Sequence, residues 1–216
     1  MKKLALAFNK LVIASNNQGK LRELQAMLTP LGIEVFTQAQ LGIGEAEEPH
    51  PTFLENALAK ARHASAASNL PALADDSGIC VAALNGAPGV LSARYASGQH
   101  AADPQSHSKI TDQQNNEKLL RDMQGIADRR AHYYCVLALV RSANDPQPII
   151  AEGEWHGEIA IQARGEAGFG YDPIFWLPEL GKMSAELTRD EKAQISHRAL
   201  ALKILLGRLN SMLKND

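Results

Sequence analysis

The sequence lacks the features that mark secreted, membrane and nucleic-acid-binding proteins. It has only two cysteines among 216 residues, Cys80 and Cys135, and each lies in an apolar run. That placement fits buried thiols in a reducing compartment, with a single disulfide between them as the alternative. No apolar run approaches the roughly 20 residues that cross a bilayer. The formal charge of −2 is not the basic excess of a nucleic-acid binder. We therefore expect a soluble, cytoplasmic protein that binds neither membranes nor nucleic acids.

The N-terminal segment does not have the pattern of a signal peptide either. Met1-Lys2-Lys3 precedes a short apolar run, but no small-residue cleavage site follows it, and 11–14 reads as a strand. Repeats, low-complexity tracts and a clear linker are also missing. A chain of this length can bury a full core, as one large domain or as two lobes that share a cleft.

What the chain does contain is an alternation of strand and helix patterns. A strand at 11–14 leads into a helical pattern that Pro30 and Gly32 stop, and a second helix is predicted from Phe53 to about Ser68. Strand patterns at 133–140, 149–154, 158–162 and 174–177 form a meander in the second half. This order predicts an α/β or α+β fold with a mixed sheet.

Two adjacent carboxylates, Asp75 and Asp76, stand at the end of an apolar run and precede Ser77 and Gly78. Because side chains alternate across extended chain, only one of the two acids can face a given cleft. Carboxylates beside a glycine turn suit a hard cation such as Mg²⁺, which takes oxygen ligands and binds substrate phosphates. The simpler interpretation is an acidic turn that is merely solvated.

The loop from Ser15 to Lys20 joins the first strand to the first helix. A strand, a glycine-containing loop and a helix N-terminus in succession can bind phosphate through backbone N–H groups and the helix dipole. Lys20 would add a mobile positive charge. The spacing is not that of a Walker loop, and a plain strand-to-helix turn is the alternative.

A helix that begins after Thr52 carries a polar stripe of Asn56, Lys60 and His63, at helical spacing. Such a stripe is usually a solvated face; the alternative is a cleft wall from which Lys60 reaches a phosphate. The loop ahead of this helix is acidic, with Glu47 and Glu48. One of the two acids, Glu47 or Glu48, would complete a metal site from a facing loop.

Glycines alternate with aromatic residues at 165–173, which allows close backbone approach beside a stacking surface. That combination suits a nucleobase or a sugar, although it also occurs where a loop is merely anchored. His100 and His107 have no metal-ligand spacing, so we expect no zinc site there.

Together these motifs resemble a known family, the inosine triphosphate pyrophosphatases that clear non-standard nucleotides, and within it the bacterial dITP/XTP diphosphatase branch. The resemblance runs in order from about residue 11 to about residue 206. It departs at Glu47-Glu48-Pro49-His50, where an acidic-Thr-Gly version is common. The motifs that carry it are Ser15-Asn16-Asn17-Gln18-Gly19-Lys20 with Glu23, Phe53-Leu54-Glu55-Asn56-Ala57 with Lys60-Ala61, Asp75-Asp76-Ser77-Gly78, Gly86-Ala87-Pro88-Gly89 with Ser92-Ala93-Arg94-Tyr95, Gly168-Phe169-Gly170-Tyr171-Asp172-Pro173 and Ser196-His197-Arg198.

The resemblance implies an α/β fold with an elongated, two-lobed mixed sheet, flanked by helices and with a central cleft. It implies a single domain over residues 1–216 that is normally a homodimer. The implied activity is Mg²⁺-dependent hydrolysis of non-standard purine nucleoside triphosphates, namely ITP, dITP and XTP. Cleavage between the α and β phosphorus atoms would give the monophosphate and pyrophosphate.

The resemblance also implies roles for residues of this chain. Asp76 would be the catalytic residue and a metal ligand, either as the base itself or as the holder of the metal that acidifies water. Glu47 or Glu48 would complete the metal site. The implied substrate-binding residues are Ser15, Asn16, Asn17, Gln18, Gly19, Lys20 and Lys60 for the triphosphate, Ser77 beside Asp76, and Phe169, Gly170, Tyr171, Asp172, Lys192, His197 and Arg198 for the nucleoside.

The chemistry of these residue types agrees with that activity. Hydrolysis of a phosphoanhydride requires charge neutralisation and an in-line water, which Mg²⁺ on carboxylates and lysines can supply. Donors from His197, Arg198 or nearby backbone would pair with the keto group of a 6-keto purine and be left unpaired by adenine. One alternative is a non-catalytic nucleotide-binding regulatory module, which would not need the acids. A pyrophosphatase of modified pyrimidine triphosphates is another.

Overall fold

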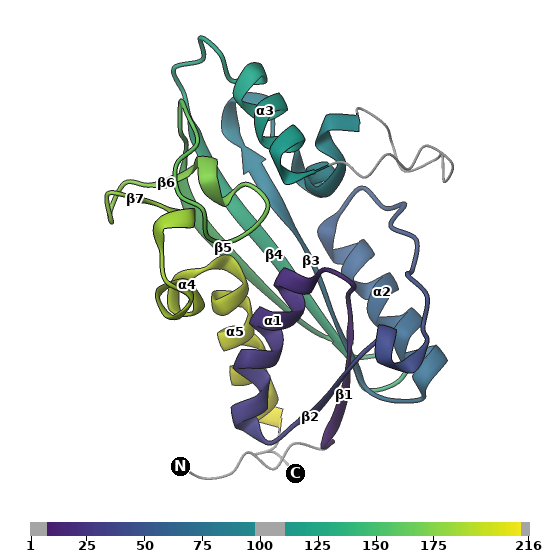
Figure 1. The fold of residues 1–216 in the computed structure, drawn as a ribbon. Coiled ribbons are helices and arrows are strands. Elements are labelled where there is room, and N and C mark those ends of the chain that lie inside the picture. Colours follow the sequence, from purple (N-terminus) through teal and green to yellow (C-terminus); the bar gives the residue numbers. More distant parts are fainter. Residues whose placement is uncertain (1–7, 98–110, 213–216) are drawn as a thin grey trace. The chain divides into compact units, whose positions relative to one another are not determined.

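The computed structural model describes residues 8–97 and 111–212, so Met1-Lys2-Lys3, His100 and His107 lie outside the described residues. Within them seven strands form one sheet in the order β2-β1-β3-β4-β5-β6-β7 (Figure 1). The predicted α/β fold with a mixed sheet is confirmed, because β1 pairs in parallel with β2 and β3, whereas β6 pairs antiparallel with β5 and β7. The strands are β1 (Lys10–Ala14), β2 (Glu34–Thr37), β3 (Ala72–Val81), β4 (Arg130–Val140), β5 (Ile149–Ile159), β6 (Phe175–Leu177) and β7 (Lys182–Met183).

The chain divides into two compact units, which we describe separately. The first unit comprises Met1–Asp76, Cys135–Gly153 and Arg198–Asp216. The second unit comprises Ser77–Tyr134 and Glu154–His197. The elongated shape and the cleft implied by the family resemblance stay predictions. The helices are α1 (Gln18–Leu28), α2 (Phe53–Ser68), α3 (Asp112–Asp122), α4 (Arg189–Ile195) and α5 (His197–Met212).

In the first unit, helices cover both faces of the parallel strands. Helices α1 and α5 lie on one face and α2 lies on the other (Figure 1). Leucines from α1 and α5 share a buried core with Leu11, Ile13 and Leu73 of the sheet. On the opposite face α2 buries alanines at Ala57 and Ala61, whose small side chains let a helix approach a sheet closely. This sandwich holds the centre of β3 rigidly between two layers.

The second unit has its own core around the remaining halves of β3, β4 and β5. Ile79, Trp155 and Phe175 are buried there together with Met123 at the end of α3. Helix α4 begins with a capping box, because the Thr188 hydroxyl accepts from the Glu191 backbone N–H and the Glu191 carboxylate accepts from the Thr188 backbone N–H. The part of the chain that the structure describes contains no helix long and apolar enough to cross a membrane.

Two expectations about strands are wrong. β3 does not turn at Gly78 but continues from Ala72 to Val81. Gly78 is required for another reason, since a Cβ there would lie 2.4 Å from both the Gly89 carbonyl oxygen and the Ser92 Oγ. Likewise the segments at 149–154 and 158–162 are not two strands, because β5 runs unbroken from Ile149 to Ile159.

Candidate functional site

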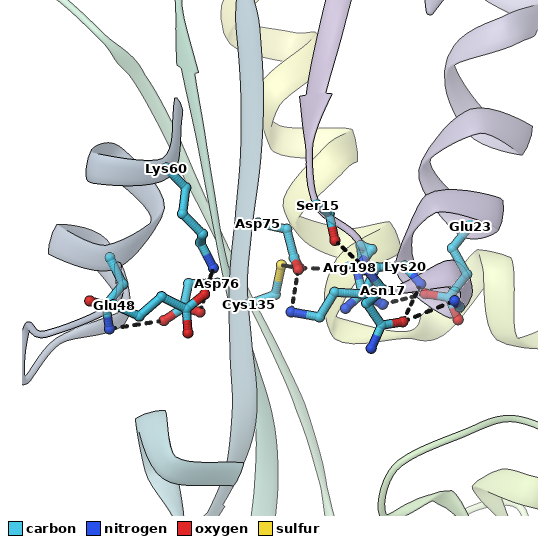
Figure 2. A network of polar contacts seen from close by, with 12 residues as sticks. Ser15, Asn17, Lys20, Glu23, Glu48, Lys60, Asp75, Asp76, Cys135 and Arg198 are labelled. Atoms are coloured by element: carbon cyan, nitrogen blue, oxygen red, sulfur yellow. Dashed lines mark hydrogen bonds and ion pairs between the residues drawn. The ribbon is translucent and has the colours of Figure 1, made fainter. Parts of the chain in front are cut away.

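The side chains of Asp75 and Asp76 point to opposite sides of β3, as strand alternation predicts (Figure 2). Asp76 faces α2 and the loop that precedes it, whereas Asp75 faces α1 and the start of α5 (Figure 2). Both residues are nearly buried, with exposed fractions of 1% for Asp75 and 6% for Asp76. Each carboxylate therefore depends on protein partners, and the two sets of partners are separate.

On the α2 side, Asp76 shares the Lys60 ammonium with Glu48. The Lys60 Nζ lies 2.8 Å from the Asp76 Oδ1 and 2.7 Å from the Glu48 Oε1. The Asn56 amide donates to the other Asp76 oxygen over 3.4 Å. Lys60 and Asn56 are one helical turn apart on α2, so this part of the polar stripe faces the strand, whereas His63 is exposed.

Side chains of α2 also anchor the acidic loop that carries Glu48. Asn56 accepts from the His50 backbone N–H and donates to the His50 carbonyl, at 3.0 and 3.1 Å. His63 contacts the Gly44 carbonyl through Nε2 at 3.1 Å. These contacts bring Glu48 to the strand, whereas Glu47 is exposed on the same loop. Of the two predicted metal ligands the structure brings only Glu48 to Asp76, and the role of Glu47 stays a prediction.

On the α1 side, Asp75 binds two cations at once. Lys20 Nζ lies 2.5 Å from its Oδ1, and Arg198 Nε lies 3.0 Å from its Oδ2. Arg198 also pairs with Glu23 of α1, and the Cys135 thiol donates to the Asp75 Oδ2 over 3.3 Å. Arg198 is 1% exposed. The structure thus places two residues with predicted substrate roles, Lys20 and Arg198, on a buried carboxylate.

The pKa values of the two acids are shifted in opposite directions. Burial works against the Asp75 carboxylate, but Arg198 and Lys20 outweigh it and hold the pKa of Asp75 far below its usual value. Burial raises the pKa of Asp76, with Lys60 and Lys20 opposing the rise and Glu48 adding to it. For Lys60, burial is outweighed by Asp76 and Glu48, which raise its pKa. Lys60 therefore stays an ammonium, and Asp76 has more affinity for a proton than an ordinary aspartate.

The predicted phosphate loop has its own internal order. The Asn17 side chain caps α1 by accepting from the backbone N–H groups of Gly19 and Lys20, at 2.9 and 3.1 Å. Ser15 Oγ accepts from the Asn17 N–H, and the Asn16 amide donates to Glu45. Gln18 is the exposed first residue of α1. The loop is therefore a capped helix start with a cation in the first turn of the helix, the arrangement expected of a phosphate site.

In the second unit, Asp172 organises the glycine-aromatic loop. Its carboxylate accepts from the Phe169 N–H at 2.9 Å, from the Ser184 hydroxyl at 2.8 Å and from the Lys192 ammonium. The same ammonium lies 4.9 Å from the centre of the Phe169 ring. The predicted pocket residues Phe169, Asp172 and Lys192 are thus brought together.

Helix α3 holds the loop from the other side. Asp112 accepts from the Gly170 N–H at 2.6 Å, and Asn116 donates to the Gly170 carbonyl at 3.1 Å. A cavity of about 480 Å³ opens between α3 and the loop, and Phe169 is part of its wall. Tyr171 is instead 3% exposed in the core, where its hydroxyl donates to the Ser92 carbonyl. Any contact of Tyr171 with a nucleoside would therefore come from its backbone.

The remaining predicted residues fall in the second unit as well. Ser77 follows Asp76 in β3 and is half-buried. His197 is 4% exposed and stacks against Tyr133, with ring centres 4.7 Å apart and planes 7° from parallel. Sequence patterns give no sign of Tyr133, Cys135 or Ser184 at these sites, because each acts through a partner distant in sequence. Asn56 had a signal, since it shares a helical stripe with Lys60.

The donor set on the α2 side fits Mg²⁺. One oxygen of Glu48 and one of Asp76 converge on the Lys60 ammonium, so both face a single cation position. Among residues 8–97 and 111–212, no group of three or more histidine, cysteine, aspartate or glutamate side chains could hold a metal ion. A pair of carboxylates with water and phosphate as further ligands is the usual Mg²⁺ arrangement.

The fold and the site define a mixed α/β protein in which strand β3 carries two buried carboxylates, each paired with a lysine. The chain belongs to the Ham1 family, whose model matches residues 11–208. A protein of Nitrosomonas europaea named dITP/XTP pyrophosphatase is 59% identical over 94% of this chain and 95% of its own length. A protein of the same name from Ralstonia nicotianae is 62% identical over 93% and 96%. The structure of a HAM1 protein from Coxiella burnetii superposes with a TM-score of 0.82 at 43% identity, covering 97% of this chain and all of that one.

Proposed function

We propose that this protein hydrolyses non-standard purine nucleoside triphosphates of the dITP and XTP class to the monophosphate and pyrophosphate. The two relatives that bear this activity in their names share about three fifths of their residues with nearly the whole chain. The observation that carries the proposal is the Asp76–Lys60–Glu48 cluster, since it combines a nearly buried carboxylate with a neutralising cation. A non-catalytic nucleotide binder would have no use for that combination.

We assign the phosphates of the substrate to the first unit. The capped N-terminus of α1 supplies a positive dipole end, and Lys20 and Lys60 supply charge. The Asn17 cap fixes the backbone of Gly19 and Lys20 before any ligand arrives, which lowers the entropy cost of binding. To reach a phosphate, the Lys20 ammonium must break its ion pair with Asp75 or bind both groups at once. We expect Asp75 to keep this ammonium near the phosphate site until the substrate binds.

We assign the nucleoside to residues of the second unit. Phe169 provides an aromatic ring for the base. Asp172, Lys192 and the contact of α3 with the Gly170 N–H hold the backbone of the Phe169 loop in place. His197 lies on the same unit with its ring already fixed by stacking. A 6-keto purine presents an acceptor where adenine presents a donor, so a donor at this position would select the keto base. The contribution of Arg198 to base recognition stays a prediction, as its guanidinium is engaged by Asp75 and Glu23.

The reacting groups of this chain would act as follows. Asp76, whose pKa burial raises, accepts the proton of the attacking water. Lys60 neutralises charge that develops on the phosphates, and its two carboxylate partners keep it protonated. Asp76 and Glu48 would hold Mg²⁺, which neutralises phosphate charge and polarises the bond that breaks.

Assembly and location belong to the proposal too. We expect a homodimer in the cytoplasm, and light scattering on a sizing column tests the dimer directly. A mass near twice 23.4 kDa supports it. A mass near 23.4 kDa at micromolar concentration refutes it.

Product analysis tests the proposed activity. ITP, XTP, ATP and GTP are offered in parallel with Mg²⁺, and products are separated by anion-exchange chromatography. Pyrophosphate with IMP or XMP, and little change in ATP and GTP, is the expected result. Release of orthophosphate would move the cleaved bond to the terminal phosphate. Tight nucleotide binding without turnover would support the regulatory-module alternative instead.

A further inference from the structure

Tyr133 of β4 touches two residues that the proposed function assigns to the nucleoside. Its ring stacks on His197 at 4.7 Å with a 7° angle, and its hydroxyl lies 3.4 Å from the Asp172 Oδ1, to which it donates. Tyr133 itself is 7% exposed. Tyr133 is therefore buried, like His197 and Asp172, and it joins these two predicted pocket residues, which come from different elements.

The Asp172 carboxylate is fully occupied by donors of the protein. Oδ1 accepts from Ser184 and Tyr133, and Oδ2 accepts from the Phe169 N–H and from Lys192. A carboxylate offers about four acceptor positions, so these four donors use its capacity. Asp172 consequently acts on a nucleoside through what it holds, the Phe169 backbone and the Lys192 ammonium.

The Tyr133 ring is itself held on its other sides. Phe175 meets it edge-on at 4.8 Å, and Trp155 lies 6.2 Å away at an angle of 23°. Trp155 also stacks on His197 at 6.3 Å. Aromatic groups packed in this way have few alternative rotamers. Burial raises the pKa of Tyr133 well above its usual value, so its hydroxyl stays a donor across the working pH range.

We propose that Tyr133 is a positioning residue for nucleoside recognition. It fixes the position of the His197 ring relative to the loop that Asp172 holds. The inference rests on the proposed function and deepens it. It predicts that damage at Tyr133 impairs recognition of the nucleoside and leaves recognition of the phosphates intact.

Two substitutions separate the contributions of the ring and the hydroxyl. Tyr133→Leu removes the stack and the donor together, and we expect KM for ITP to rise about 10-fold, the size of an aromatic contact with one hydrogen bond. Tyr133→Phe keeps the stack and removes only a long hydrogen bond, so KM rises about 2-fold. Ser184→Ala removes a shorter bond to the same Asp172 oxygen without touching His197, and we expect about a 5-fold rise.

Inorganic tripolyphosphate, used as a competitive inhibitor, separates positioning from general damage. It carries the phosphates without a nucleoside, so its inhibition constant stays at the wild-type value in Tyr133→Leu while KM for ITP rises. Tyr95→Phe is the matched control, because it loses a hydroxyl that donates to Asp122 at 2.6 Å outside the pocket. It should lower the melting temperature and leave KM unchanged.

The outcomes decide the inference independently of the activity. Equal losses for ITP and tripolyphosphate in Tyr133→Leu would mean a structural role only, and unchanged KM would overturn the inference outright. A KM for ITP that is close to the wild-type value in Tyr133→Phe and clearly raised in Tyr133→Leu supports the inference. If Tyr133→Leu does not fold, Tyr133→Phe and Ser184→Ala still decide, since both keep the packing nearly intact. If the wild-type enzyme does not turn over ITP, the proposed function fails first. The dissociation constants of ITP and of tripolyphosphate, measured by titration for the wild type and for Tyr133→Leu, then still test the role of Tyr133.

Discussion

Replacing Asp75 with asparagine should destabilise the first unit far more than the same change at Asp76. Asp75 is the carboxylate that both Lys20 and Arg198 face, and Arg198 is 1% exposed. Loss of one partner from a buried ion pair costs roughly 3–5 kcal/mol, because a charge is left buried without compensation. Arg198 keeps Glu23, and asparagine retains one acceptor, so we expect about 3 kcal/mol, the lower end of that range.

Asp76→Asn is the matched control, one residue away on the same strand. Lys60 keeps its contact with Glu48 at 2.7 Å when Asp76 is neutralised. At Asp75 the cations outweigh burial and lower the pKa, whereas at Asp76 burial outweighs the lysines and raises it, so loss of the Asp76 charge removes less stabilisation. We expect the free energy of unfolding to change by about 1 kcal/mol or less, the size of a net hydrogen-bond contribution.

Urea unfolding monitored by far-ultraviolet circular dichroism measures both variants. With a slope of about 2–3 kcal/mol/M for a chain of this size, 3 kcal/mol lowers the midpoint for Asp75→Asn by about 1–1.5 M. Both tryptophans, Trp155 and Trp176, belong to the second unit, so their fluorescence shows whether that unit unfolds in the same transition. Equal midpoints for the two variants would refute the reasoning, since they would show that the partners of Asp75 contribute no more than those of Asp76.

Three further predictions concern charge at single positions. Asp76→Asn should reduce kcat for ITP by at least about 1,000-fold while nucleotide binding stays measurable by titration, and near-wild-type turnover would remove Asp76 from the chemistry. Lys20→Ala should weaken competitive inhibition by tripolyphosphate more than inhibition by IMP, and equal effects would place Lys20 outside the phosphate site. Asp145 has a pKa lowered chiefly by its hydrogen bonds with Arg141, so its stabilising effect is present above the unfolded pKa of about 3.9 and is lost as the pH falls toward the folded value. Asp145→Asn should therefore unfold at lower urea than wild type at pH 7, with a gap between the two midpoints that begins to narrow only below about pH 4, and a gap that is unchanged below that pH would argue against the ion pair.

Local patterns predicted the parts of the fold that depend on neighbours in sequence. The capping residue Thr52 marks a helix start where the structure has one, and strand alternation predicts that Asp75 and Asp76 lie on opposite faces, as they do. The prediction of a turn at Gly78 is wrong. The glycine is needed because the chain approaches the Gly89 carbonyl closely there, which no local pattern encodes. The resemblance to a known family supplied the residues of the site, and the structure supplied their partners.

The partners of Arg198 show where sequence reasoning stops. They are Asp75 and Glu23, at separations of 123 and 175 residues. Pairing over such distances depends on α1 and α5 meeting on one face of the sheet, a consequence of packing that periodicity does not reveal. Cys135 shows the same limit. It is the buried thiol that the sequence predicts, but its hydrogen bond to Asp75 depends on packing and has no local pattern.

The adjacency of Asp75 and Asp76 has a physical consequence for the proposed chemistry. Because β3 is extended, one residue of separation places the two acids on different faces, each among its own cations. Asp75 meets two cations and is held ionised, whereas Asp76 shares a single lysine with Glu48 and keeps its affinity for protons. Asp76, the proposed proton acceptor, and Asp75, which anchors two cations, therefore have pKa values shifted in opposite directions although they are neighbours on one strand.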